Sequence, residues 1–111
     1  MGVQKDAGEL LFFFYDELIN KRKRYVETKD VIDVTKWESN RINLAFQYLK
    51  DSNIIESRET TGVTNGVINF RISKLTPNGI NSIENKDKFK NTFGFEINLG
   101  VIKFSWSRTK K

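Results

Sequence analysis

The stretch that decides the fold is residues 35–55, TKWESNRINLAFQYLKDSNII. Its apolar residues recur at steps of three and four, which predicts an amphipathic helix from Lys36 to about Asp51, with Thr35 as its N-cap. The residues expected to face inward are Ile42, Ala45, Phe46 and Leu49. The opposite side carries a polar row at the same spacing, made of Lys36, Asn40, Asn43, Gln47 and Lys50. By spacing alone, this row fits either a binding surface or an ordinary solvated helix face.

Two further helices are expected before this one. Thr28 can cap a short helix that runs to about Val34, so that two helices meet over one or two residues, as in a helix-turn-helix. Asp6 to Asn20 predicts a longer helix with two apolar stripes side by side, Leu11/Phe14/Leu18 and Phe12/Tyr15/Ile19. Because this face is wider than a three-helix core needs, we expect a second surface, in the same chain or in a partner, to cover part of it.

Two strands and a fourth helix are expected after it. Residues 54–60 and 67–73 predict strands, and Asn65-Gly66 between them predicts a tight hairpin turn, because both residues tolerate positive φ. In Leu75-Thr76-Pro77-Asn78-Gly79, Thr76 is the expected cap and Pro77 the first position of a helix that ends near Asn85.

The C-terminal part predicts a charged connector at residues 86–91 and then an antiparallel hairpin over 93–106, turning at Leu99-Gly100. In the expected register, the hairpin pairs Phe93 with Trp106, Phe95 with Phe104, Ile97 with Ile102 and Glu96 with Lys103.

Composition argues against several kinds of chemistry. The chain has no cysteine and no histidine, so disulfides, thiol nucleophiles and the commonest metal ligand are excluded. Asp16-Glu17 is the best carboxylate pair, but adjacent helical residues point apart. We therefore expect no enzyme, no catalytic residue, no metal and no cofactor. Without a signal-peptide pattern or a long apolar run, a cytoplasmic protein is expected.

The net charge of +5 is unevenly distributed. Residues 1–84 carry as many acidic as basic side chains, and the whole excess lies in residues 85–111. An excess of basic residues that is confined to residues 85–111 favours nucleic-acid binding only weakly. Within the neutral part, however, residues 36–50 and 57–74 each have a net charge of +2.

The order helix, helix, helix, two strands, helix resembles the winged helix-turn-helix proteins. Ile42…Ala45-Phe46…Leu49…Ile54-Ile55 is similar to a recognition helix that leads into its wing, and the Leu75–Gly79 segment is similar to the L-T-P-x-G segment of small MarR-like and PadR-like regulators. Asn53 stands where these proteins often have glycine. The resemblance covers about residues 8–85. It implies an α+β fold with a winged-helix core over 6–85, whereas residues 86–111 match no family. The length of the chain predicts one domain, residues 1–111, and the alternation of apolar residues over 93–106 adds the hairpin over 92–107.

The resemblance also implies a double-stranded DNA-binding regulator that acts as a homodimer. Carried over by position, the base-reading candidates are Ser39, Asn40, Asn43 and Gln47. Lys36, Arg41 and Lys50 would contact phosphates or guanine, and the wing contacts would be Arg58, Asn65 and Arg71. The expected dimer contacts are Phe12, Tyr15, Ile19, Phe95, Phe104 and Trp106.

Other interpretations stay open at this point. A winged helix can bind only protein, as an assembly subunit or an antitoxin-like partner, because fold does not decide function. An aromatic and basic C-terminal hairpin would suit a membrane surface, although internal packing explains the aromatics more simply. Lys21-Arg22-Lys23-Arg24 could contact phosphates or act as a targeting signal, or it could be a solvated helix end. Trp37 could face DNA, but packing across the helix pair is favoured. Whether a small-molecule effector binds is unknown from the sequence.

Overall fold

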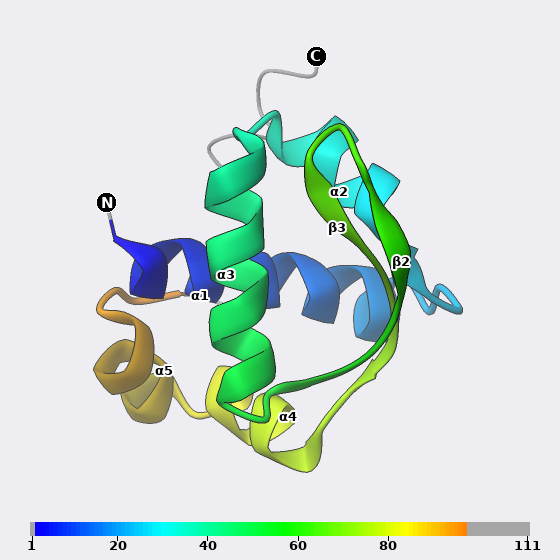
Figure 1. Cartoon of the computed structure of the whole chain (residues 1–111). Helices are drawn as coiled ribbons and strands as arrows, with labels where there is room; N and C mark the ends of the chain where they lie inside the picture. Colours follow the sequence, from blue (N-terminus) through cyan, green and yellow to red (C-terminus); the bar gives the residue numbers. More distant parts are fainter. Residues whose placement is uncertain (1, 98–111) are drawn as a thin grey trace.

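The computed structural model describes residues 2–97. These residues form a mixed α+β fold in which a three-stranded antiparallel sheet of order β1-β3-β2 lies at one side of the helices (Figure 1). The elements in chain order are α1 (Val3–Tyr15), the π-helical turn η1 (Asp16–Asn20), β1 (Val26–Glu27), α2 (Thr28–Thr35), α3 (Ser39–Asp51), β2 (Ile55–Thr64), β3 (Val67–Leu75), α4 (Pro77–Glu84) and α5 (Lys86–Phe93).

Helix α1 forms the centre of the core. Every residue from Leu10 to Tyr15 is buried, because α3, α4 and α5 all pack against this helix. Figure 1 shows α3 crossing in front of α1, with the β2–β3 hairpin beside it. The expected helix over residues 6–20 is confirmed in position, but its last turn is π-helical.

The breadth of the α1 apolar face has an internal explanation. Phe12 is 4% exposed and Tyr15 is 8% exposed in the single chain, so neither is left over for a partner. Phe95 is half-buried and packs edge-on against Phe89 of α5. Of the expected dimer contacts, Ile19 is exposed, and Phe104 and Trp106 lie outside the described residues. Of the two expected alternatives, cover from the same chain therefore holds for Phe12 and Tyr15, and these two residues are not open dimer contacts in this structure.

The N-terminal caps of α2 and α3 both differ from the expected ones. Glu27, not Thr28, caps α2, and it forms a reciprocal capping box with Asp30. The Thr28 hydroxyl instead donates to the Ile68 carbonyl and accepts from the Phe70 amide, both at 2.8 Å, which joins α2 to β3. Lys36 has φ 59° and ends α2, so α3 begins only at Ser39, with Glu38 in the cap position.

The hairpin turn and the start of α4 are confirmed. Asn65 and Gly66 have φ values of 51° and 85°, as a two-residue turn requires. Thr76 Oγ1 accepts from the Gly79 amide at 2.9 Å, and Pro77 occupies the first helical position. A Cβ on Gly79 would overlap the Ile54 carbonyl oxygen, which explains the glycine in the Leu75–Gly79 segment.

The expected connector at residues 86–91 is wrong, because Lys86 to Phe93 form helix α5. Asn85 Oδ1 caps this helix by accepting from the Lys88 amide at 3.0 Å. Phe89 and Phe93, four residues apart, are buried on one face, with ring centroids 4.8 Å apart. Phe93 therefore does not start a strand, so the expected pairing of Phe93 with Trp106 is wrong. The rest of the expected hairpin, from residue 98 onward, lies outside the described residues.

Candidate nucleic-acid interface

Helix α3 has one buried side and one open side. The four residues expected to face inward, Ile42, Ala45, Phe46 and Leu49, are all 0% exposed. On the opposite side, Asn40, Leu44 and Gln47 are exposed, and Leu44 retains 47% of its surface in solvent. Lys36 is exposed just before the helix begins. The structure therefore leaves four members of the polar row exposed, Lys36, Asn40, Gln47 and Lys50.

Asn43 faces the hairpin instead of solvent. Its Nδ2 donates to the Gly66 carbonyl and its Oδ1 accepts from the Ile68 amide, both at 3.0 Å. Ser39, one turn earlier, lies so close that a Cβ on Gly66 would be 2.9 Å from its Oγ. Asn43 thus fixes the hairpin turn against α3, and its side-chain amide is not free to read bases in this arrangement. Ser39 is half-buried beside the turn.

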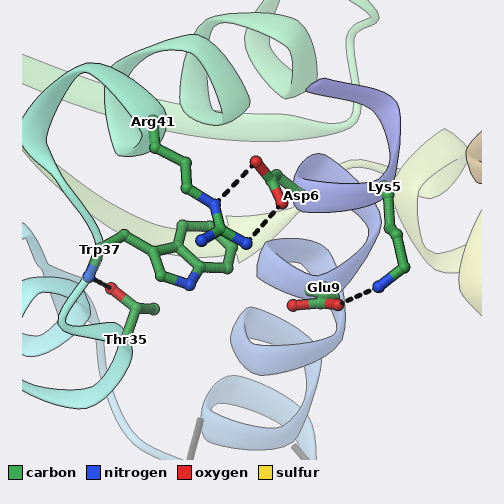
Figure 2. Close-up of polar contacts among 6 residues, drawn as sticks. All are labelled: Lys5, Asp6, Glu9, Thr35, Trp37 and Arg41. Carbon is green, nitrogen blue, oxygen red and sulfur yellow. Dashed lines mark hydrogen bonds and ion pairs between the residues drawn. The ribbon is translucent and has the colours of Figure 1, made fainter. Parts of the chain in front are cut away.

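Arg41 is held by α1 (Figure 2). Its Nε and Nη2 each donate to a carboxylate oxygen of Asp6 at 2.9 Å, while the guanidinium lies 4.1 Å from the centre of the Trp37 ring. Asp6 is 7% exposed, so the pair joins α1 to α3 at the edge of the core. Trp37 is half-buried and packs on the core beside this pair, as the packing interpretation expected. Arg41 is therefore a structural residue here and not an open phosphate contact.

The C-terminal half of α3 has its polar groups paired. Lys50 forms an ion pair with Glu59 of β2 at 2.5 Å. Gln47 Nε2 donates to Asp51 Oδ1 one turn further along the helix at 2.9 Å. These pairings leave this end of the helix with little positive charge to offer a phosphate. The exposed hydrogen-bond donors that are not paired in this way lie at the N-terminal end of α3.

The three expected wing residues have different surroundings. Asn65 is exposed at the turn that Asn43 and Ser39 hold. Arg71 donates to Glu27 at 2.7 Å and covers the Tyr25 ring at 4.2 Å, and the hydrogen bond to Glu27 raises the pKa of the guanidinium further. Arg58 is exposed and makes no hydrogen bond or ion pair with any residue from 2 to 97.

The tetrabasic run is partly used by η1. Lys21 Nζ lies 2.9 Å and Lys23 Nζ 2.6 Å from the carboxylate of Glu17, which is 5% exposed. Burial would raise the pKa of Glu17, but the hydrogen bonds from Lys23 and Lys21 outweigh burial and lower it. The two lysines therefore compensate a buried charge, whereas Arg22 and Arg24 are exposed.

Within residues 2–97, no group of three acidic, cysteine or histidine side chains is placed to hold a metal ion. None of the described helices is long and apolar enough to cross a membrane. Compared with protein-family models, curated proteins and solved structures, the chain shows no significant match.

Proposed function

We propose that this protein is a non-enzymatic, winged-helix protein that binds double-stranded DNA through the N-terminal half of α3 and the turn of the β2–β3 hairpin. The observation that carries the proposal is a pair of hydrogen bonds: Asn43 Nδ2 donates to the Gly66 carbonyl, and the Ile68 amide donates to Asn43 Oδ1. They hold the hairpin turn beside the open face of Asn40, so helix and turn present one surface. Recognition helices contact base edges mainly with their N-terminal residues, while a wing contacts the backbone or minor groove.

The element order also supports this proposal. A short strand between the first two helices pairs with the second strand of the hairpin, which gives the strand order β1-β3-β2. This arrangement, with the hairpin directly after α3, is the one expected of a winged helix. On α3, just before it and at the hairpin turn, the expected DNA contacts that are exposed and outside an ion pair are Lys36, Asn40, Gln47 and Asn65, while Arg58, also exposed, lies farther along β2.

These four side chains suit distinct roles. Asn40 has no hydrogen-bond partner among the described residues, and its amide can both accept and donate at an adenine edge. Lys36 and Asn65 lie at the helix start and at the hairpin turn, where backbone contacts are expected. Gln47 can join the groove contacts once its bond to Asp51 is exchanged.

The test compares Asn40→Ala with Asn81→Ala, an equally exposed asparagine on α4. A preferred duplex is first selected from a random pool, and binding to it and to an unrelated duplex is measured by fluorescence anisotropy. Asn40→Ala should weaken binding to the selected duplex by about 1–3 kcal/mol and leave unrelated duplex binding unchanged. Equal loss on both duplexes, or loss equal to that of Asn81→Ala, would refute base reading by Asn40.

A second candidate function is protein binding through the same surface, which the exposed side chains of Leu44 and Val63 favour. They retain 47% and 62% of their surface in solvent, and Gln47, one turn after Leu44, is already hydrogen-bonded to Asp51. Apolar side chains framed by neutral polar groups are typical of a protein interface. A protein-binding module predicts no measurable affinity for any duplex at low salt.

Homodimerisation remains part of the proposal because winged-helix regulators commonly bind two half-sites. Among the expected dimer contacts that fall in residues 2–97, Ile19, 42% exposed at the end of η1, is the exposed one. Sedimentation at roughly 10–100 µM protein should show a dimer, on the affinity scale of specific assemblies. A monomer over this whole range would remove dimerisation from the proposal without affecting DNA binding.

A further inference from the structure

A hollow of about 500 Å³ opens between the β2–β3 hairpin and the first turn of α2. Its lining includes Lys29, Arg58, Thr60 and Arg71, together with one acid, Glu27. None of these residues belongs to the surface of α3 and the hairpin turn proposed for DNA. The hollow is therefore a separate feature of the molecule.

The charge of the lining is unbalanced. Three cations face a single carboxylate, and Arg71 already occupies that carboxylate at 2.7 Å. Lys29 and Arg58 form no ion pair with any residue of the described part of the chain. Two cationic side chains are thus left without a counter-charge at the rim of a concave site.

The strand register makes this imbalance costly. Arg58 of β2 and Arg71 of β3 are direct cross-strand partners. Like charges at directly opposed positions destabilise a sheet, and Glu27 compensates the charge of Arg71 but leaves Arg58 without a carboxylate. Just beyond it, the register shifts between Glu59 and Val63, and Thr60 lies in the irregular stretch with its hydroxyl free of partners in residues 2–97.

We infer that the hollow binds a phosphoryl group, with Arg58 as its principal ligand and Lys29, Arg71 and Thr60 as supporting donors. A guanidinium can donate two parallel hydrogen bonds to a phosphate, which favours arginine at such a site. The size of the hollow suits a phosphate ester of nucleotide size rather than a bare ion. The phosphoryl group can come from a small phosphate ester or from a nucleic-acid backbone.

The test is an NMR titration of the ¹⁵N-labelled chain with inorganic phosphate and with adenosine 5′-monophosphate, at ionic strength held constant with chloride. Amide signals of residues 27–29, 58–60 and 69–71 should shift and saturate. Arg58→Gln should lower the affinity for adenosine 5′-monophosphate by about tenfold. Lys74→Gln removes the same charge from an exposed site on β3 outside the lining and should leave the affinity unchanged.

Shifts that do not saturate, or equal effects of the two variants, would overturn the inference. Both variants change exposed strand residues, so dispersed spectra of each confirm that the fold is intact. Duplex DNA added to the monophosphate complex then identifies the source. Displacement assigns the hollow to the DNA backbone, and simultaneous binding assigns it to a small ester. The monophosphate titration contains no DNA, so its result stands whether or not the chain binds a duplex.

Discussion

Two polar side chains of α3 connect elements that are far apart in the sequence. Asn43 ties the helix to the hairpin turn, and Arg41 ties it to Asp6 of α1. Both positions fall on or beside the outward polar row, where helix periodicity places solvent. Both are instead half-buried by neighbours that come from other elements.

Asn43→Ala should lower the free energy of unfolding by about 1–3 kcal/mol, because it leaves the Ile68 amide and the Gly66 carbonyl without partners. Asn40→Ala, three residues earlier on the open face, should change it by less than about 0.5 kcal/mol. Urea denaturation of both variants measures the difference. If the two variants lose equal stability, Asn43 does not hold the hairpin.

Arg41→Lys tests the second connection. Lysine keeps the charge but cannot make two parallel hydrogen bonds to Asp6 or stack its planar group on Trp37. The loss expected is about 1–2 kcal/mol of unfolding free energy. Arg58→Lys is the matched control and should have almost no effect on stability, since Arg58 has no partner in residues 2–97. Comparable losses in both variants would contradict the structural role of Arg41.

For individual residues, the sequence predicts which side of a helix is buried better than it predicts the hydrogen-bond partners of side chains. Periodicity identified all four buried residues of α3, because burial follows the helix repeat. It could not identify the bond of Arg41 to Asp6, 35 residues away, because that contact depends on how α1 crosses α3. Hence Arg41 and Asn43 were predicted as DNA contacts, whereas the structure uses both side chains internally.

Among the elements, α1 and α4 are joined by a hydrogen bond that responds to pH. Tyr15 Oη donates to Glu84 Oε2 at 2.7 Å. Burial, together with this bond and the charge of Glu84, raises the pKa of Tyr15 to about 12. Because the pKa in the folded state is above the ordinary value of 10, the stability from neutral Tyr15 is complete below pH 10 and is lost as the pH rises through about 12.

Tyr15→Phe should therefore be less stable than the natural chain at pH 8, by about 1 kcal/mol for the lost hydrogen bond. The difference in unfolding free energy between the two chains should narrow between pH 10 and 12, because only the natural chain has the buried phenol of Tyr15, which ionises there. Urea denaturation at pH 8 and pH 11 measures this change. Tyr25→Phe, which alters an exposed tyrosine, should lose as much unfolding free energy between pH 8 and pH 11 as the natural chain does. An unchanged difference at pH 11 would show that Tyr15 ionisation is not linked to folding.

The sequence predicted elements with strong local signals and missed one with a weaker signal. Asn65-Gly66 and Thr76-Pro77 specify a turn and a helix start through backbone preferences, and both are confirmed. Helix α5 was missed because the alternation of Phe93, Phe95 and Ile97 was weighed above the four-residue step from Phe89 to Phe93. Asn85, a good cap three residues before Lys88, was the local signal for this helix.

For the whole molecule, the location of charge decides between the two proposed functions. Within residues 2–97, several of the cations expected to face DNA form ion pairs with carboxylates instead, including Arg41, Lys50 and Arg71. Lys36 is the exposed cation left beside the N-terminal end of α3. A DNA complex built on this surface must therefore depend on Lys36 more than on the other exposed lysines of the described chain.

The most direct measurement of the central claim is the salt dependence of binding to a random duplex, compared between Lys36→Glu and Lys86→Glu. Both variants change the net charge equally, but Lys86 lies on α5. The natural chain should lose affinity steeply with salt, with a slope of about −0.9 per neutralised phosphate in a plot of log K against log salt. Lys36→Glu should weaken binding and make this slope shallower by about 1, while Lys86→Glu should leave it unchanged. Equal slopes for both variants, or no binding by the natural chain at low salt, would contradict DNA binding by α3 and the hairpin turn.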